Sequence, residues 1–223
     1  MAPTVELLPM VIALGIASTL SPGILAIVLA LLSGKHYPMK RSLAFLAGML
    51  PTVLIIAAAG AGIFAFASAG KDSSESAYVD LALGALFLLF AILPWIWKGK
   101  DPTASQLKDA SAPAPHLGRW FLLGFVATIT NFDAVLIYFT EIKEIAGSSA
   151  ILLSKLLLGT LGALFFLLPA LLPIFVAIAY PKKAEKMLTP IRALMQKYGN
   201  YLVTLIMLAF GAFFLYRAYA AFG

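Results

Sequence analysis

An amide and a carboxylate lie close together in the middle of a long apolar run. The stretch TNFDAVLIY, residues 130–138, contains Asn131 and Asp133 with no basic neighbour. Burying an aspartate at the centre of a membrane helix costs about 2.5–3.5 kcal/mol on the insertion scale, so such residues are kept mainly where they bind or move something. A carboxylate in this place can bind a proton or a cation, and Asp133 would be a metal ligand if a metal cation is bound. We therefore take Asp133 and Asn131 as candidate binding residues.

Two structural interpretations of these residues are also open. Asp133 could form a buried ion pair with Lys143 or Lys155, which lie further along the chain. Asn131 could serve only to cap backbone groups at a helix break.

The residues that follow Asp133 extend one polar face of the predicted helix. Asp133, Ile137, Thr140 and Glu144 are spaced by four, three and four positions, which places them on one helical stripe. The stripe could be a polar path toward the outer mouth, with Lys155 beside it. It could equally be one buried residue with ordinary loop residues above it.

The first apolar run carries a matching interruption. Pro22 removes a backbone donor and Gly23 permits unusual dihedrals, so a helix is expected to break there. Hydroxyl and amide side chains flank both interruptions and offer partners to freed backbone groups: Ser18, Thr19 and Ser21 on one side, and Thr128, Thr130 and Asn131 on the other.

Composition places these residues in a membrane protein. Of the 223 residues, 62% are apolar and only 12% are charged, about half the charge of a soluble domain. The absence of cysteine excludes disulfides and thiolate metal sites. The sequence has no His-Glu-x-x-His, Gly-x-Ser-x-Gly, paired intramembrane aspartates or cysteine–histidine set, so we expect neither an enzyme nor a cofactor.

Charges and turn residues divide the chain into six apolar spans, each long enough to cross a bilayer. The predicted spans are 7–33, 42–68, 76–97, 120–145, 150–180 and 200–221. With both termini outside, twelve of the sixteen lysine and arginine residues fall in cytoplasmic loops. The positive-inside rule therefore predicts an all-α protein of six transmembrane helices with N-out and C-out termini.

The two halves of the chain resemble one another. ASTLSPGILAIVL (17–29) aligns with ATITNFDAVLIYF (127–139), and LALGALFLLF (81–90) aligns with LAFGAFFLYR (208–217). Because each half has three spans, the second half enters the membrane from the opposite face. We therefore predict two inverted three-helix repeats, 1–98 and 118–223, joined by a flexible cytoplasmic linker over 99–117.

The two interruptions also match in depth. At 1.5 Å per residue, Pro22 lies about 16 Å from the end of the first span near Gly34, and Asn131 lies about 18 Å from Arg119. Both positions are near the middle of a hydrocarbon core about 30 Å thick. Broken helices that meet at the midplane form the usual substrate site of inverted-repeat carriers.

Three stretches carry a resemblance to a known family. STLSPGILAIVLALLSGKHYPMKRSLAFLAGMLPTVL (18–54) resembles the first hairpin of the LysE superfamily of membrane transporters, and TNFDAVLIYF resembles its fourth-helix motif. The stretch from 179 to 219 is similar to the end of the GAP branch, the peptidoglycolipid-addressing or Sap-like proteins. The resemblance implies a six-helix exporter, often dimeric, with substrates from basic amino acids to divalent cations and, in this branch, cell-wall lipids.

This chain departs from the family motif at one important place. Where the family has Pro-Lys after the asparagine, the chain has Phe132 and Asp133, so a positive position has become negative. The change favours a cation or a proton at this position over the anionic or zwitterionic substrate contact that the family motif would imply.

Two functions follow from these observations. The first is a secondary carrier in the plasma (inner) membrane that exports a small cationic or zwitterionic solute, a metal ion or an amino acid, coupled to H⁺ or Na⁺. The second is a membrane accessory protein that places lipids or envelope components without transporting ions. Membrane lipids and the solute are the expected partners, and the net charge of +6 needs no nucleic acid because basic residues fall where anionic headgroups lie.

Overall fold

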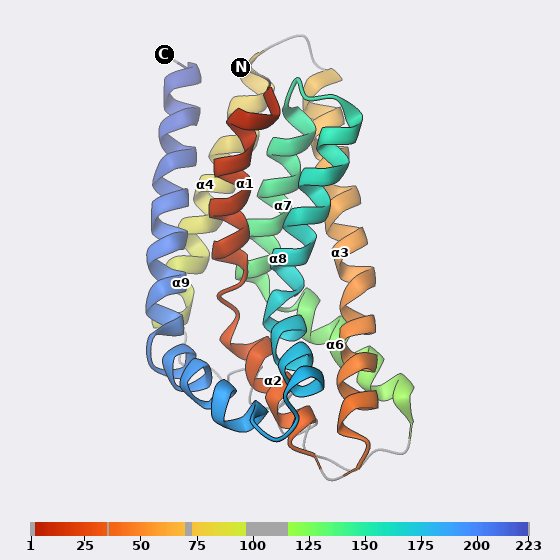
Figure 1. The fold of residues 1–223 in the computed structure, drawn as a ribbon. Coiled ribbons are helices and arrows are strands. Elements are labelled where there is room, and N and C mark those ends of the chain that lie inside the picture. Colours follow the sequence, from red (N-terminus) through yellow and green to blue (C-terminus); the bar gives the residue numbers. More distant parts are fainter. Residues whose placement is uncertain (1–2, 35, 70–72, 97–115, 223) are drawn as a thin grey trace.

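The computed structural model of the chain describes residues 3–34, 36–69, 73–96 and 116–222, and every described element is a helix. In chain order the helices are α1 (Pro3–Ser18), α2 (Pro22–Leu32), α3 (Pro38–Ala69), α4 (Ser73–Ile96), α6 (Leu117–Ile129), α7 (Phe132–Gly147), α8 (Leu152–Ala179) and α9 (Ala184–Phe222). They run up and down in one elongated bundle (Figure 1). The prediction of an all-α protein is confirmed. The predicted linker lies almost wholly outside the described residues, and α6 begins at Leu117.

Several of these helices can cross a bilayer. Helices α3, α8 and α9 each contain an apolar span long enough to do so alone: Pro38–Ile63, Leu152–Ala179 and Lys197–Phe222. Two bent pairs, α1 with α2 and α6 with α7, each meet the same criterion as one span, which gives up to five spans among the described residues. The predicted span 76–97 coincides with α4, whose apolar stretch, Ala77–Leu93, is shorter. The chain is a multi-pass membrane protein.

The bends in the two pairs fall where the sequence predicts interruptions. The axes of α1 and α2 differ by 57°, and those of α6 and α7 differ by 72°. The first break spans residues 19–21, slightly before its predicted place at Pro22 and Gly23. The second spans residues 130–131, at its predicted place around Asn131. The reason at the first break is that proline is well suited to begin a helix, because its missing N–H would have no partner there. Pro22 therefore starts α2 and does not lie in the gap.

Most contacts that a helix of the first half makes have a counterpart made by the corresponding helix of the second half. Helix α3 packs against α6 and α7, and α8 packs against α1 and α2. Helices α2 and α3 are in contact, as are α7 and α8, and α4 pairs lengthwise with α9. These pairings are the ones that an internal two-fold relationship between the halves produces.

Two glycine pairs lie at close helix crossings. A Cβ atom at Gly48 of α3 would collide with the backbone carbonyl of Phe121, and a Cβ at Gly124 of α6 would collide with the carbonyl of Phe45. Each glycine thus faces the residue three positions before the other one. Small residues allow this approach, which is a common means of holding membrane helices together.

The crossing of α4 and α9 is reciprocal in the same way. The position of a Cβ at Gly84 would lie 2.8 Å from Leu215 Cγ, and that of a Cβ at Gly211 would lie 2.9 Å from Leu88 Cγ. Each leucine lies four residues after the glycine of its own helix. Gly84 and Gly211, which the sequence alignment of the halves treats as equivalent, therefore lie at one crossing and make equivalent contacts.

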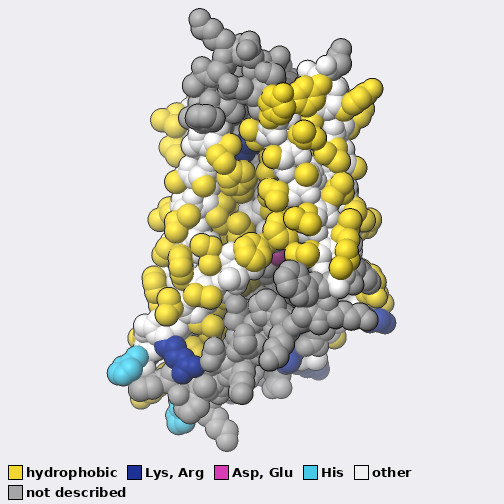
Figure 2. All heavy atoms as spheres, turned by 180° about the vertical axis from the view of Figure 1, so that it is seen from behind, with side chains coloured by type: hydrophobic (Ala, Val, Ile, Leu, Met, Phe, Trp, Pro, Cys, Tyr) yellow, Lys and Arg dark blue, Asp and Glu magenta, His cyan; other side chains and the backbone are white. Residues whose placement is uncertain are grey.

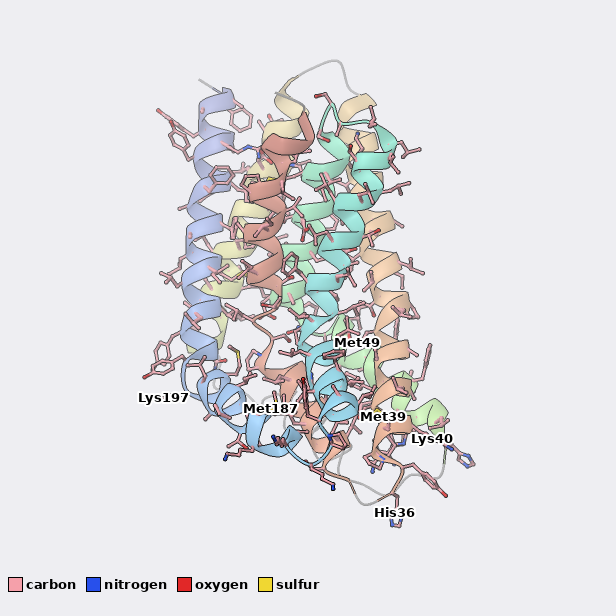
Figure 3. The ribbon with its side chains drawn as sticks, in the orientation of Figure 1. His36, Met39, Lys40, Met49, Met187 and Lys197 are labelled. Carbon is pink, nitrogen blue, oxygen red and sulfur yellow. The ribbon has the colours of Figure 1, made fainter. Side chains whose placement is uncertain are left out.

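Charge divides the molecule along its long axis. The described chain begins and ends at the same end of the bundle (Figure 1). On the face in Figure 2, hydrophobic side chains cover the middle, whereas histidines and most visible lysine and arginine side chains lie at the lower end. His36, Lys40 and Lys197 lie at the end opposite the termini (Figure 3).

The first part of α9 lies across this basic end. Leu188 is buried, and it packs with Ile191 and Met195 against residues of α2 and α8. Met187, Leu194 and Tyr198 are exposed large hydrophobic residues on the same segment. The segment thus has one apolar face against the bundle and further apolar side chains on its surface, as an interfacial helix does.

Candidate functional site

The two helix breaks are in direct contact. The amide Nδ2 of Asn131 donates a hydrogen bond of 2.8 Å to Oγ of Ser21. Ser21 is the N-cap of α2 and Asn131 is the N-cap of α7, and their backbones are similar, with φ −117° and ψ 82° against φ −83° and ψ 67°. The breaks expected at matched depths are therefore joined through equivalent residues.

The other polar side chains at the breaks bond within their own helices. Ser18 Oγ donates to the Gly15 carbonyl, and Thr19 Oγ1 donates to the Ile16 carbonyl, at 2.8 and 2.7 Å. Thr128 and Thr130 likewise donate to the carbonyls of Gly124 and Val126. Such bonds to carbonyls three or four residues earlier favour helix bending, so these hydroxyls support the breaks and the Ser21–Asn131 pair bridges them.

Asp133 lies in the first turn of α7, directly after the second break. The backbone N–H groups of Asp133 and Ala134 lie close to its carboxylate. A helix N-terminus stabilises a negative charge by about 0.3–1 kcal/mol, and by up to about 2 kcal/mol when partly buried. This stabilisation offsets only part of the cost of about 2.5–3.5 kcal/mol for an aspartate at membrane depth. The remaining cost leaves Asp133 suited to bind a proton or a cationic group.

The lysines considered as partners of Asp133 are engaged elsewhere. Lys155 Nζ donates a hydrogen bond of 2.7 Å to the carbonyl of Ala146, which ties the start of α8 to the end of α7. Lys143 Nζ forms ion pairs with Asp80 and Glu144. Among the described residues, no salt bridge to Asp133 is present.

Four charged side chains form a closed ring between α4, α7 and α9. Lys143 contacts Asp80 and lies 3.0 Å from Glu144 Oε1. Arg217 completes the ring, with Nη2 at 3.1 Å from Asp80 Oδ2 and Nη1 at 3.0 Å from Glu144 Oε1. The side chains of Asp80 and Lys143 are only 5% and 7% exposed. The ring therefore joins three helices at the end of the bundle where the described chain begins and ends.

The stripe of α7 that starts at Asp133 ends in the ion-pair ring. Glu144, the last residue of the stripe, is in the helix and belongs to the ring, so it is not an ordinary loop residue. Between it and Asp133, Ile137 is 2% exposed and Thr140 is fully buried. Thr140 Oγ1 has no hydrogen-bond partner among the described residues. The polar stripe is thus closed in this conformation by Ile137 and by the ion-pair ring.

Sequence reasoning did not single out Asp80, Arg217 or Glu141. Asp80 and Arg217 lie within apolar helices at one end, where the sequence assigned them to span ends. Glu141 is fully buried on α7, and neither carboxylate oxygen has a hydrogen-bond partner among the described residues. The available signal was the presence of further charges, Glu141 included, in the same apolar run as Asp133.

The described part of the chain holds no group of three or more histidine, aspartate or glutamate side chains placed for a metal ion. A cation at Asp133 would therefore be held by one carboxylate together with neutral oxygens.

Comparison with known proteins places this arrangement in a family. The family model described as Sap, sulfolipid-1-addressing protein, matches residues 11–220, which include both breaks, the ion-pair ring and the α4–α9 crossing. No curated protein and no solved structure shows significant similarity to the chain. The match agrees with the resemblance of the sequence to the Sap-like branch, and the chain belongs to the Sap, sulfolipid-1-addressing protein, family.

Proposed function

We propose that the protein is a secondary active transporter whose binding site lies where the two helix breaks meet. The observation that carries the proposal is the hydrogen bond between Asn131 and Ser21, with Asp133 two residues after Asn131 in the first turn of α7. Unwound backbone and helix ends at the membrane midplane are how many inverted-repeat carriers bind solutes and ions. No catalytic set accompanies this site in the sequence, which supports transport over enzymatic chemistry.

The proposed topology has six spans, with α4 as the third and both termini outside. The exchanged helix contacts and the reciprocal glycine crossings support two inverted repeats. The lysines and histidine at the opposite end support placing that end in the cytoplasm. Alternating access would then arise from movement of one repeat against the other, about the joined breaks.

The proposed solute is small and cationic or zwitterionic, a metal ion or an amino acid, and it is exported in exchange for H⁺ or Na⁺. Asp133 supplies the negative charge for an ammonium group or a metal ion. The first-turn N–H groups of α2, which have no side-chain cap, offer hydrogen bonds to a carboxylate. A zwitterion therefore finds a partner for each of its charges at the break.

A second candidate function rests on the family match. The family description names a sulfolipid, and the α9 segment that lies across the basic end has exposed Met187, Leu194 and Tyr198. Both observations favour a protein that helps to place a lipid or envelope component without transporting ions. This function requires no proton or sodium gradient.

The test is transport by the purified protein in liposomes. Radiolabelled amino acids and divalent metal ions are presented under a proton gradient, a sodium gradient or neither, and Asp133→Asn liposomes serve as the matched control. We expect gradient-dependent flux of one solute class that the variant lacks. A fluorescent anionic glycolipid is measured in the same liposomes. Lipid movement without solute flux, unaffected by either gradient or by Asp133→Asn, would replace the carrier with the second function.

A further inference from the structure

A buried carboxylate that has no assigned role lies on the face of α7 that packs against α8. Glu141 is 0% exposed, and its Oε1 and Oε2 atoms have no hydrogen-bond partner among the described residues. It lies about 13 Å along α7 from Phe132, at 1.5 Å per residue. The facing residue Gly162 lies about 15 Å from the start of α8 by the same measure. The carboxylate is therefore enclosed between α7 and α8, within one turn of Glu144 along α7.

The space around Glu141 is made by a glycine and two aromatic rings. A Cβ atom at Gly162 would lie 2.7 Å from Glu141 Cδ, so only glycine at 162 leaves room for the carboxyl group. One turn earlier on α7, the ring of Tyr138 packs 5.0 Å from that of Phe166 of α8. Both rings are buried. Water has no path to the carboxyl group along this face in the present conformation, because α8 covers it.

Few charged groups face Glu141 from the helices around it. Tyr138 is the titratable side chain that interacts with it. The described charges of α3, Lys40 and Arg41, lie near its first turn at the opposite end of the bundle. Helix α1 contributes no charged side chain between Leu7 and Ser18.

The remaining charges near this part of α7 are already paired. Lys155 of α8 is bound to the Ala146 carbonyl, and Asp80 of α4 is held in the ring by Lys143 and Arg217. The described charge of α6, Arg119, lies in its first turn and near Trp120. Thus no cation is placed to balance an ionised Glu141.

An ionised carboxylate in such a place is far less stable than its neutral acid. Transfer of an isolated charge into an apolar interior is so unfavourable that a group normally becomes neutral instead, and uncompensated charges within membrane spans are rare for this reason. A neutral carboxylic acid needs only one donor and one acceptor to be satisfied. Protonation is the physical means by which Glu141 can occupy this site.

We propose that Glu141 is a proton-binding site that carries a proton in this conformation and releases it when α8 moves away from α7. On release, the O–H bond of the carboxylic acid breaks, the proton passes to water, and the carboxylate remains. This inference rests on the proposed transport function for its purpose, since it names H⁺ as the coupling ion and places it apart from the solute site at Asp133. The protonation itself can be tested without any solute.

The first test is infrared spectroscopy of the purified protein in lipid at neutral pH. The carbonyl stretch of a protonated carboxylic acid is separate from that of a carboxylate. We expect a protonated-acid band that Glu141→Gln removes and that Glu144→Gln, a change to an ion-paired acid on the same helix, leaves in place. The spectrum of Asp133→Asn shows how much of the protonated-acid band comes from Asp133. An unchanged spectrum in Glu141→Gln overturns the proposal.

A second variant, Glu141→Met, tests by thermal unfolding whether the carboxyl group of Glu141 stabilises the fold. Glu141→Met has a similar shape and removes both unpartnered oxygens, so we expect its midpoint of thermal unfolding to be higher than that of the wild type. A lower midpoint would mean that the carboxyl group makes a stabilising contact, which contradicts an unpartnered acid.

The third test connects the site to transport in the liposomes described above. We expect solute flux to respond to a pH gradient in the wild type and to lose that response in Glu141→Gln. A variant that responds like the wild type excludes Glu141 as the coupling site. If the wild type moves no solute at all, the proposed function fails, whereas the infrared result still decides whether Glu141 binds a proton.

Discussion

Asn131 and Ser21 are 110 residues apart in the chain, yet the amide of one donates a 2.8 Å hydrogen bond to the hydroxyl of the other. The same two residues lie opposite each other when 17–29 is aligned with 127–139, and each is the N-cap of the helix that follows its break. The proposed two-fold relationship between the halves would place this contact on its axis, because equivalent residues of two such halves can meet only there. The hydrogen bond joins the two helix breaks at the candidate site.

Breaking this bridge should weaken the fold in a way that depends on both residues. Ser21→Ala leaves the Asn131 amide without its acceptor, which costs about 1–3 kcal/mol for a buried group. In a double-mutant cycle with Asn131→Ala, thermal unfolding in detergent should give a coupling of about 0.5–1.5 kcal/mol. As a control, Thr160→Ala, whose hydroxyl bonds to the Leu156 carbonyl of its own helix, should be additive with Asn131→Ala.

Replacing Asp133 should separate function from stability. Asp133→Asn keeps the size of the side chain and removes a charge that has no ion pair among the described residues, so we expect unchanged or higher thermal stability together with loss of coupled flux. Stability is read in detergent and flux in liposomes. A variant that transports normally would contradict the assignment of Asp133 to the site.

Replacing Asp80, the buried acid of the ion-pair ring, should lower thermal stability, in contrast to replacing Asp133. Asp80→Asn leaves Lys143 and Arg217 without one of their partners, and removing one member of a buried pair destabilises by about 3–5 kcal/mol. The measurement is the midpoint of thermal unfolding beside that of Asp133→Asn. Equal stability of the two variants would mean that the ring contributes little to holding α4, α7 and α9 together.

Filling a glycine at the α3–α6 crossing should separate the two helices. A Cβ at Gly48 collides with the Phe121 carbonyl, and overpacking of this kind costs about 1–3 kcal/mol. The matched control is Gly62→Ala on the same helix, where a Cβ meets no atom within 4 Å. We expect the control to be neutral or stabilising, because alanine favours helix more than glycine does. A Gly48→Ala variant as stable as the control would contradict the close crossing.

The orientation of the chain can be read from single cysteines, because the native sequence has none. A cysteine added at either terminus should react with a membrane-impermeant maleimide in intact cells. A cysteine in place of His36, which is exposed at the opposite end, should react only after the cells are opened. Protection of both termini would reverse the proposed topology.

Much of the fold was predictable because apolar runs and helix breakers act locally. The predicted spans coincide with described helices, and Pro22 and Asn131 predicted both breaks to within a few residues. The shift at Pro22 has a local cause, the preference of proline for the first turn of a helix. The equivalence of Gly84 and Gly211 also followed from the sequence, because each lies in a similar stretch of small and aromatic residues.

The remaining part of the site depends on packing, which single stretches do not reveal. Asp80 and Arg217 meet Lys143 and Glu144 because α4 and α9 cross closely beside α7, and no local pattern links residues so far apart in the chain. On α7, the stripe of Asp133 and the neighbouring face of Glu141 are both consistent with the helical period. Only the position of α8 determines that Glu141 faces Gly162 and is covered.

The ring of four charges has an electrical consequence. It contains two positive and two negative side chains, so as a unit it carries no net charge. A single unit charge that crosses 100 mV exchanges about 2.3 kcal/mol with the membrane field, whereas the ring, moved as one body, exchanges none. Helices α4, α7 and α9 can thus shift together at that end without voltage opposing or driving them. Any voltage sensitivity of the protein is then carried by charges outside the ring.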